Sequence, residues 1–320
     1  MTDRNALLVP AGGFSQPRMY RRRRRTLLVV AAFLTFLLAT SGAGFVALTW
    51  HRNADHHKFI STNGWPAVGQ GAYRVGSGPE AVSPSERPAP IASVAKVMTA
   101  YVVLHERPLD PDANGPSLTV TADDVVDTAE RRSRDESVID VAEGERLSER
   151  QALVALMLPS ANNVAIMLAE WVADSVPAFV KLMNDAADDL DMTQTTYTDP
   201  SGYDPATAST AADQLKLAEA VVGDPVLSPI MAMRSADLPV AGTVHNTNTL
   251  LGQDGFDGMK TGSTDAAGAC LMFHALRYVN GQPVDVLGVV LGQPGLRGQP
   301  LIDSALAAAK QLAERLAPDS

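Results

Sequence analysis

A long apolar run covers residues 26–50, which contain no charged side chain. It follows an unbroken basic run, Arg21–Arg25. About 20 apolar residues are enough to cross a bilayer, and arginines stay on its cytoplasmic side. The pattern predicts a cytoplasmic tail over residues 1–25, a span over residues 26–50 and delivery of the rest to the outside. A signal peptide cleaved after residues 41–43 is the alternative, but the apolar run continues to Trp50, which favours a retained anchor.

The pattern changes after this run. Residues 51–64 are polar and predict a solvated linker, and residues 70–75 predict a short strand. Residues 76–90 are rich in proline and serine, which predicts a loop. Ile91–Leu104 is almost wholly apolar. A helix of that composition is expected to be buried in the middle of a domain.

Two apolar runs near the C-terminus flank Asn280-Gly281, which is a strong signal for a hairpin turn. The runs, Ala267–Tyr278 and Val284–Leu291, therefore predict a pair of antiparallel strands. Leu301–Leu316 is amphipathic and predicts a closing helix. Strands thus occur at both ends of the region beyond the linker, with helices between them.

Charge is distributed unevenly along the chain. The formal net charge of the 320 residues is −10, yet residues 51–320 hold 19 basic and 35 acidic side chains. An acidic body repels phosphates, so no nucleic-acid partner is expected. The single cysteine, Cys270, excludes an internal disulfide and a multi-cysteine metal site. His56-His57 lies in the polar run and is expected to be part of the solvated linker.

Ser93 and Lys96 stand out within the apolar helix predicted from Ile91. Residues three apart share a helix face, and a helix N-terminus favours negative charge. A serine hydroxyl needs an adjacent base to act as a nucleophile, and lysine is such a base only when neutral. Burial and a neighbouring cation both lower a lysine pKa from about 10.4. The pair predicts a nucleophile with its base; the alternative is an N-cap serine beside a lysine that reaches the surface.

A second candidate segment lies at a break between two predicted helices. Ser148 and Gln151 fit a capping box, and the helix that they begin stops at Pro159. Ser160 and Asn162 follow the break, where a hydroxyl can relay a proton and an amide can hold a substrate amide. Ordinary turn chemistry is the alternative interpretation.

A third candidate segment is Lys260-Thr261-Gly262-Ser263, in a predicted edge strand. Lys260 and Thr261 offer a cation and a hydroxyl to an anionic group of a substrate. Glycines beside them, such as Gly262, allow a ligand to approach the backbone closely. The alternative is a solvated lysine that protects the sheet edge.

Ser93-x-x-Lys96, Ser160-x-Asn162 and Lys260-Thr261-Gly262 occur in that order, with gaps of 67 and 100 residues. The set resembles the motifs of the penicillin-recognising, β-lactamase-like serine peptidases. Among these it resembles the D-alanyl-D-alanine carboxypeptidases of the low-molecular-mass penicillin-binding protein type. Further segments fit the same family: Pro90–Ser93, Met98–Ala100, Gly144-Glu145, Asp199–Tyr203, Ser209–Ala211 and Asn246–Asn248.

The resemblance implies a catalytic role for three side chains. Lys96 would take the proton of Ser93, which attacks the carbonyl between two terminal D-alanines. The backbone N–H groups of Ser93 and Ser263 would hold the oxyanion. Ser160 would pass the proton to the leaving D-alanine, and water would then hydrolyse the acyl-enzyme.

The resemblance also implies the substrate-binding residues. Asn162 would hold the peptide amide, and Lys260 would bind the terminal carboxylate with the help of Thr261. Gly262 and Ser263 complete this strand. The implied ligands are peptidoglycan stem peptides, with β-lactams as inhibitors, and neither a metal nor an organic cofactor is expected.

The implied fold is α/β (α+β): an antiparallel sheet flanked by helices, plus a mostly helical region, as in β-lactamases and DD-peptidases. Residues 51–65 would be a linker and residues 66–318 the catalytic domain, without the additional β-domain of some relatives. The expected location is a bacterial cell membrane, with a single span and an extracytoplasmic catalytic domain; an exported domain without disulfides suits that envelope.

Two other functions compete with this one. A class A β-lactamase would carry a deacylating glutamate after the Ser-x-Asn motif, in a Glu-x-x-Leu-Asn type segment. Glu170, the only glutamate between Asn163 and Gly202, is not followed by that pattern. A non-catalytic penicillin-binding envelope or sensor protein is the second alternative. The intact motif side chains argue against it, and a cytoplasmic tail of residues 1–25 is too short for an output domain.

Overall fold

The computed structural model describes residues 59–62 and 64–316. The tail predicted over residues 1–25, the span over residues 26–50 and the signal-peptide alternative all lie outside them. Within the described ranges, no single helix combines the length and the apolar composition that a membrane crossing requires. One bent pair, Asn162–Ala173 with Val176–Asp189, meets that test jointly, with an angle of 86° between its halves.

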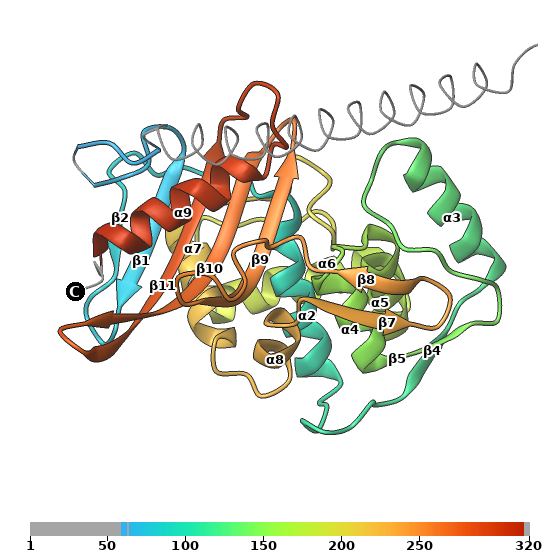
Figure 1. Ribbon diagram of the computed structural model, residues 1–320. Coiled ribbons are helices and arrows are strands. Elements are labelled where there is room, and N and C mark those ends of the chain that lie inside the picture. Colours follow the sequence, from blue (N-terminus) through green and yellow to red (C-terminus); the bar gives the residue numbers. More distant parts are fainter. Residues whose placement is uncertain (1–58, 63, 317–320) are drawn as a thin grey trace, which may run out of the picture. The chain divides into compact units, whose positions relative to one another are not determined.

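A five-stranded antiparallel sheet brings the two ends of the described region together (Figure 1). Its order is β2-β1-β11-β10-β9, so the strand that carries Lys260 is an edge strand, as predicted. The strands are β1 (Gln70–Val75), β2 (Ala81–Val82), β9 (Phe256–Thr264), β10 (Gly268–Val279) and β11 (Gln282–Gln293).

The predicted hairpin turn joins β10 to β11. Asn280 and Gly281 have φ angles of 52° and 72°. Positive φ at both central residues is the geometry of a type I′ turn, which asparagine and glycine adopt most readily. The turn fixes the register in which Phe273 pairs with Gly288.

Helices cover both faces of the sheet, which explains the long apolar run in β11. α9 (Asp303–Leu316) packs with Val286 and Val290, and α7 (Ala211–Val221) packs with Leu287 and Val289. Successive strand residues point to opposite faces, so a strand covered on both sides is apolar throughout.

The middle of the chain is mostly helical, as predicted, with short strand pairs around it (Figure 1). The helices are α2 (Lys96–Glu106), α3 (Ala122–Ser133), α4 (Glu149–Met157), α5 (Asn162–Ala173), α6 (Val176–Asp189) and α8 (Leu227–Met231). The pairs are β3 (Ala89–Pro90) with β6 (Ala208–Ser209), β4 (Ser117–Thr119) with β5 (Arg146–Ser148), and β7 (Ser235–Leu238) with β8 (Gly242–His245).

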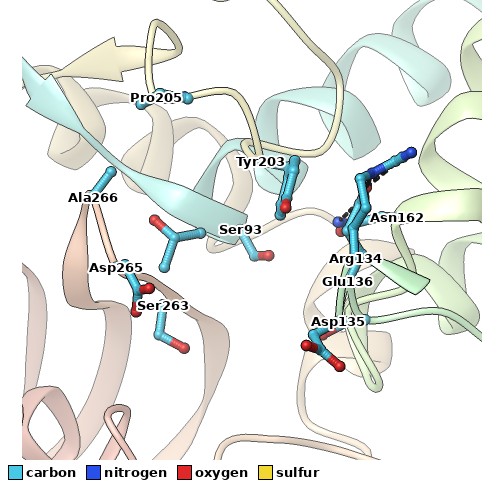
Figure 2. A pocket seen from close by; sticks show the side chains of 12 residues that line it. Ser93, Arg134, Asp135, Glu136, Asn162, Tyr203, Pro205, Ser263, Asp265 and Ala266 are labelled. Atoms are coloured by element: carbon cyan, nitrogen blue, oxygen red, sulfur yellow. Dashed lines mark hydrogen bonds and ion pairs between the residues drawn. The ribbon is translucent and has the colours of Figure 1, made fainter. Parts of the chain in front are cut away.

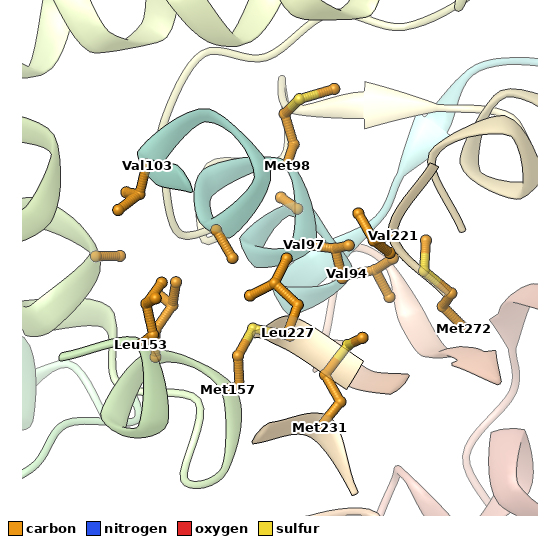
Figure 3. Close-up of a cluster of buried hydrophobic side chains, with 14 of the residues drawn as sticks. Val94, Val97, Met98, Val103, Leu153, Met157, Val221, Leu227, Met231 and Met272 are labelled. Carbon is orange, nitrogen blue, oxygen red and sulfur yellow. The ribbon is translucent and has the colours of Figure 1, made fainter. Parts of the chain in front are cut away.

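The apolar helix predicted from Ile91 is present and lies within the core (Figure 3). Its first turn is a 3-10 helix, η1 (Ala92–Ala95), and α2 continues from Lys96. No side chain in the described residues caps the N-terminus of η1 or α2, so interpreting Ser93 as an N-cap is wrong. Full burial of a valine or methionine contributes about 1.5–3 kcal/mol, and such packing holds this helix in place.

α4 begins at the predicted capping box. Ser148 Oγ accepts from the Gln151 backbone N–H at 3.2 Å, and Gln151 Oε1 accepts from the Ser148 N–H at 2.9 Å. The helix ends at Met157 ahead of Pro159, and α5 starts at Asn162. The break predicted between two helices is therefore present.

Two predictions for the N-terminal part of the described residues need correction. Phe59 and Ile60 lie in the linker predicted over residues 51–65, yet they are buried in a cluster with α9. The Phe59 backbone N–H also donates to Gln311 Oε1 at 2.9 Å. Their apolar side chains place Phe59 and Ile60 in the packed domain, ahead of the boundary predicted at residue 66. The loop predicted over residues 76–90 contains β2 and β3.

His274 on β10 lies between carboxylates of the two neighbouring strands. Its Nδ1 is 2.7 Å from Asp257 Oδ1, and its Nε2 is 3.2 Å from Asp285 Oδ1. Burial opposes the imidazolium, but the two carboxylates outweigh burial and raise the pKa of His274. The resulting stabilisation is complete below the ordinary histidine pKa of about 6.5 and is lost as pH rises through the folded-state pKa.

We expect His274→Asn to destabilise the fold more at about pH 5.5 than at about pH 8.5. The side chains of Asp257 and Asp285 are 54% and 65% exposed, so solvent screening limits the difference to about 1 kcal/mol. Thermal unfolding of the variant and the parent protein at both pH values measures it. Equal losses of stability at the two pH values would contradict the ion-pair account.

Candidate active site

Ser93 and Lys96 form a hydrogen-bonded pair where η1 meets α2. Lys96 Nζ donates to Ser93 Oγ at 2.8 Å and to the backbone carbonyl of Ser201 at 2.9 Å. Lys96 is fully buried, whereas Ser93 lines a cavity and is partly exposed. The interpretation of Lys96 as a lysine that reaches the surface is therefore wrong.

The surroundings of Lys96 favour its neutral form. Burial lowers the pKa of Lys96 well below its usual value, and the charge of Lys260 lowers it further. Asp199 and Glu136 act in the opposite direction without cancelling the shift. Only the neutral amine can accept a proton from the Ser93 hydroxyl, so the environment suits a general base.

The Ser201 carbonyl is held over Lys96 by a tight turn. The Asp199 carboxylate accepts from the Ser201 N–H and the Tyr203 N–H, both at 3.1 Å. Gly202 has a φ of 75°, and a Cβ at this position would lie 1.9 Å from the Ala92 carbonyl oxygen. The turn therefore packs directly on η1, and a larger residue than Gly202 would separate them.

Ser160 and Asn162 lie at the break between α4 and α5. Ser160 has a φ of 64°, and its hydroxyl is buried without a hydrogen-bond partner among residues 59–62 and 64–316. Asn162 Nδ2 donates to Glu136 Oε2 at 2.8 Å. Asn162 Oδ1 is also buried and lacks a partner in the described ranges. Both side chains keep unused hydrogen-bonding capacity, which ordinary turn residues at a surface would satisfy with water.

β9 carries Lys260, Thr261, Gly262 and Ser263 along one side of the site. Lys260 is buried, and its Nζ donates to the Thr261 backbone carbonyl at 3.0 Å. Burial lowers the pKa of Lys260 to about 7. The alternative of a solvated edge lysine is therefore wrong. The Thr261 hydroxyl bonds to the hydroxyl of Thr247, which belongs to the Asn246–Asn248 segment.

Gly262 sets the distance between β9 and the nucleophile. A Cβ at this position would lie 2.8 Å from the Ser93 backbone nitrogen and 2.9 Å from the Val94 nitrogen. Real side chains do not approach backbone atoms so closely, so glycine is required here. This close approach brings Ser263, the next residue of the strand, to the cavity that Ser93 lines.

A cavity of about 490 Å³ joins these segments (Figure 2). Ser93 lies between Ser263 on one side and Asn162 on the other, and Tyr203 forms part of the wall. Lys96, which bonds to Ser93, is buried behind this lining. The structure thus brings Ser93, Asn162 and Ser263, one residue from each predicted motif segment, to one cavity. Ser160, Lys260 and Thr261 are buried and do not line it.

The sequence motifs did not identify every residue of the site. Glu136 lines the cavity and bonds to Asn162, but it stands in no recognised motif. The Ser201 carbonyl is a backbone group, so residue type gives no sign of it. The Asp199–Tyr203 segment did fit the family pattern, and that was the available signal for the turn over Lys96.

Residues 83–295 match the family model described as D-alanyl-D-alanine carboxypeptidase. The chain belongs to this family. An Escherichia coli D-alanyl-D-alanine endopeptidase is 32% identical over 206 residues, which is 61% of each protein. The Escherichia coli carboxypeptidase DacD is 32% identical over 219 residues, 65% of this chain and 53% of DacD. The chain thus spans about half to three fifths of the length of these curated relatives.

Solved structures of similar fold agree with the family. An evolved penicillin-binding protein homolog from Mycobacterium tuberculosis superposes with a TM-score of 0.66 at 27% identity, covering 80% of this chain and 95% of that one. A Streptomyces DD-transpeptidase gives a TM-score of 0.67 at 24% identity, covering 78% and 97%. The predicted DD-peptidase-like α/β fold is therefore confirmed.

We expect Gly262→Ala to slow acylation of Ser93 by a fluorescent penicillin. The added methyl would push β9 away from the Ser93 backbone nitrogen, and misplacement of about 1 Å can cost about 100-fold in rate. Gly258→Ala is the matched control in the same strand, because a Cβ there would meet its nearest neighbour at 3.7 Å. Equal rates for both variants would show that the close approach at Gly262 is not needed.

Proposed function

We propose that this chain is a serine D-alanyl-D-alanine carboxypeptidase that removes the terminal D-alanine from peptidoglycan stem peptides. The observation that carries the proposal is the fully buried Lys96 amine, 2.8 Å from the Ser93 hydroxyl at the edge of the cavity. A buried neutral amine beside a partly exposed serine is the arrangement that acyl transfer requires.

Acylation begins when Lys96 Nζ takes the proton of Ser93. Ser93 Oγ bonds to the carbonyl carbon between the two D-alanines, and negative charge develops on the carbonyl oxygen. The backbone N–H groups of Ser93 and Ser263 hold this oxyanion, each contributing about 3–4 kcal/mol. When the tetrahedral species collapses, the C–N bond breaks, and the proton that Lys96 took from Ser93 passes through the Ser160 hydroxyl to the leaving amine nitrogen. Water then attacks the ester carbonyl, the bond to Ser93 Oγ breaks, and a proton of the water returns to Ser93 Oγ as the shortened peptide leaves.

Substrate binding uses the two sides of the cavity. Asn162, which lines the cavity, holds the peptide amide. Lys260 and Thr261 provide positive charge and a hydroxyl for the C-terminal carboxylate. Binding of the carboxylate favours protonated Lys260, whose pKa of about 7 in the free protein leaves it poised to gain a proton.

The test is mass spectrometry of a pentapeptide that ends in D-alanyl-D-alanine, incubated with the purified full-length chain. We expect a tetrapeptide and free D-alanine, with a long-lived adduct when benzylpenicillin is added. Rapid turnover of benzylpenicillin without release of D-alanine would indicate a β-lactamase instead. Penicillin labelling without either product would indicate a sensor. Glu170, the candidate deacylating residue, is exposed on α5 and is not part of the cavity lining, which speaks against the β-lactamase.

We also propose that the catalytic domain lies outside a bacterial membrane, anchored by residues 26–50. The support is the uncharged apolar run behind Arg21–Arg25 and the extracytoplasmic position of peptidoglycan-type substrates in this proposal. Protease added to spheroplasts should degrade the domain while a cytoplasmic marker stays intact. Protection of the domain, or its recovery in the medium, would contradict the anchor.

A further inference from the structure

The edge strand β9 contains one residue more than the part of β10 with which it pairs. Two consecutive residues of β10, His274 and Ala275, pair with Gly258 and Phe256. Asp257 is therefore an extra residue between the two pairs, which makes this point of the strand a β-bulge. Bulges next to active sites change the direction in which a side chain points.

The bulge turns Lys260 toward the face of the sheet that carries the nucleophile. Phe256 and Lys260 are four residues apart, and in an unbroken strand such residues share a face. Instead, Phe256 packs in the apolar cluster with α9, whereas Lys260 pairs with Met272, which packs in the cluster of η1 and α2. One extra residue reverses the face of every side chain beyond it. Without the bulge, Lys260 would point to the α9 side, away from Ser93.

The backbone between the bulge and Lys260 is strained. Met259 is buried and has a φ of 78°, which is uncommon for a residue other than glycine. A strained conformation persists only where the surrounding structure holds it. The contacts that attach the bulge to the neighbouring strands therefore help to keep Lys260 in its position.

His274 attaches the bulged residue to the sheet. Its Nδ1 lies 2.7 Å from Asp257 Oδ1, and its Nε2 lies 3.2 Å from Asp285 Oδ1 on β11. A carboxylate only accepts hydrogen bonds, so both contacts form when both ring nitrogens carry protons. One imidazolium thus joins β9, β10 and β11 at the level of the bulge. The imidazole is only 16% exposed, so it is the fixed partner of the exposed Asp257 carboxylate.

We propose that His274 is a positioning residue for Lys260: by holding the bulged Asp257, it fixes the strand conformation in which Lys260 faces the substrate carboxylate. The inference rests on the proposed function, because it concerns carboxylate binding in the same site. His274 does not line the cavity, so it acts through β9 and does not touch the reacting atoms.

The test measures kcat/KM of His274→Ala for a peptide that ends in D-alanyl-D-alanine and for the same peptide with a C-terminal amide. A loosened bulge displaces Lys260, so kcat/KM should fall about 10-fold for the carboxylate peptide and less than about 3-fold for the amide. In the Lys260→Met background, His274→Ala should have no further effect. Asp257→Ala should behave like His274→Ala, whereas Asp257→Asn keeps an oxygen for His274 and should lose less.

Arg74→Gln is the matched control. Arg74 lines a groove that His274 also lines, and it pairs with Glu219 of α7 at 2.8 Å. The variant removes an ion pair from the same face of the sheet without touching β9, so its kcat/KM for both peptides should equal that of the parent protein. If His274→Ala lowers kcat/KM equally for both peptides, or slows the Lys260→Met protein as much as the parent, its role is only structural and the proposal fails.

Crystal structures of the parent protein and of His274→Ala test the geometry without any activity. We expect the bulge to shift and Lys260 Nζ to leave the Thr261 carbonyl, from which it lies 3.0 Å in the parent. An unchanged β9 would overturn the proposal. If His274→Ala does not fold, Asp257→Ala gives the same comparison at an exposed residue. If the parent protein releases no D-alanine, the proposed function fails separately, and the crystal structures still decide the role of His274.

Discussion

Replacing Lys96 by methionine is expected to slow acylation of Ser93 by about 10²- to 10⁴-fold, the usual contribution of a general base. Methionine preserves the length and apolar stem of the side chain but cannot accept the Ser93 proton. The fully buried site already disfavours the charged form of Lys96, so the fold should tolerate the replacement. The second-order rate of labelling by a fluorescent penicillin measures the effect, and thermal unfolding checks the fold.

Lys181→Met is the matched control for this variant. Lys181 lies on α6 with 74% of its side chain exposed and pairs with Asp185 at the surface. Its removal should leave the labelling rate unchanged. A folded Lys96→Met protein that labels within about 10-fold of the parent would show that another group serves as the base.

Replacing Lys260 by methionine is expected to lower kcat/KM for a D-alanyl-D-alanine peptide by about 10- to 150-fold. This is the range for losing a hydrogen bond to a charged group, about 1.5–3 kcal/mol. For a peptide with a C-terminal amide in place of the carboxylate, the same substitution should lower kcat/KM much less, because this peptide offers no negative charge to Lys260. Equal losses for both peptides would mean that Lys260 does not bind the carboxylate.

The pH dependence of kcat/KM for Lys260→Met is an independent test of the states assigned to Lys96 and Lys260. In the parent protein, kcat/KM requires neutral Lys96 and charged Lys260, so it should fall on the alkaline side above about pH 7, where free Lys260 loses its proton. That alkaline limb should disappear in the variant. The charge of Lys260 also lowers the pKa of Lys96, so the acidic limb should move to higher pH. An unchanged profile would contradict both assignments.

Local sequence signals predicted much of the fold because each acts over a few residues. The capping box at Ser148, the Asn280-Gly281 turn and the apolar helix from Ile91 are fixed by neighbouring chemistry, and all are present. The double-sided burial of β11 follows from its uninterrupted apolar run. The polar residues around Phe59 and Ile60 predict a linker at this point. The burial of these two side chains depends on α9, about 250 residues away.

The sequence predicts only those residues of the candidate site that belong to a recognisable motif. Ser93, Lys96, Asn162 and Ser263 meet where expected because each belongs to a short recognisable pattern. Glu136 could not be found in this way, since its place at the cavity depends on a contact with Asn162, 26 residues away, and on two arginines that resemble ordinary surface charges. The burial of Lys260 does not follow from the sequence either, because a lysine on an edge strand is usually exposed.

The most direct test of the account is intact-mass spectrometry of the full-length chain and of Ser93→Ala after exposure to benzylpenicillin. The parent protein should gain the mass of one penicilloyl group, and peptide mapping should place it on Ser93. Ser93→Ala should gain nothing while unfolding at a temperature close to that of the parent. An adduct of equal yield on Ser93→Ala, or one mapped to another residue of the parent, would contradict the assignment of Ser93 as the nucleophile.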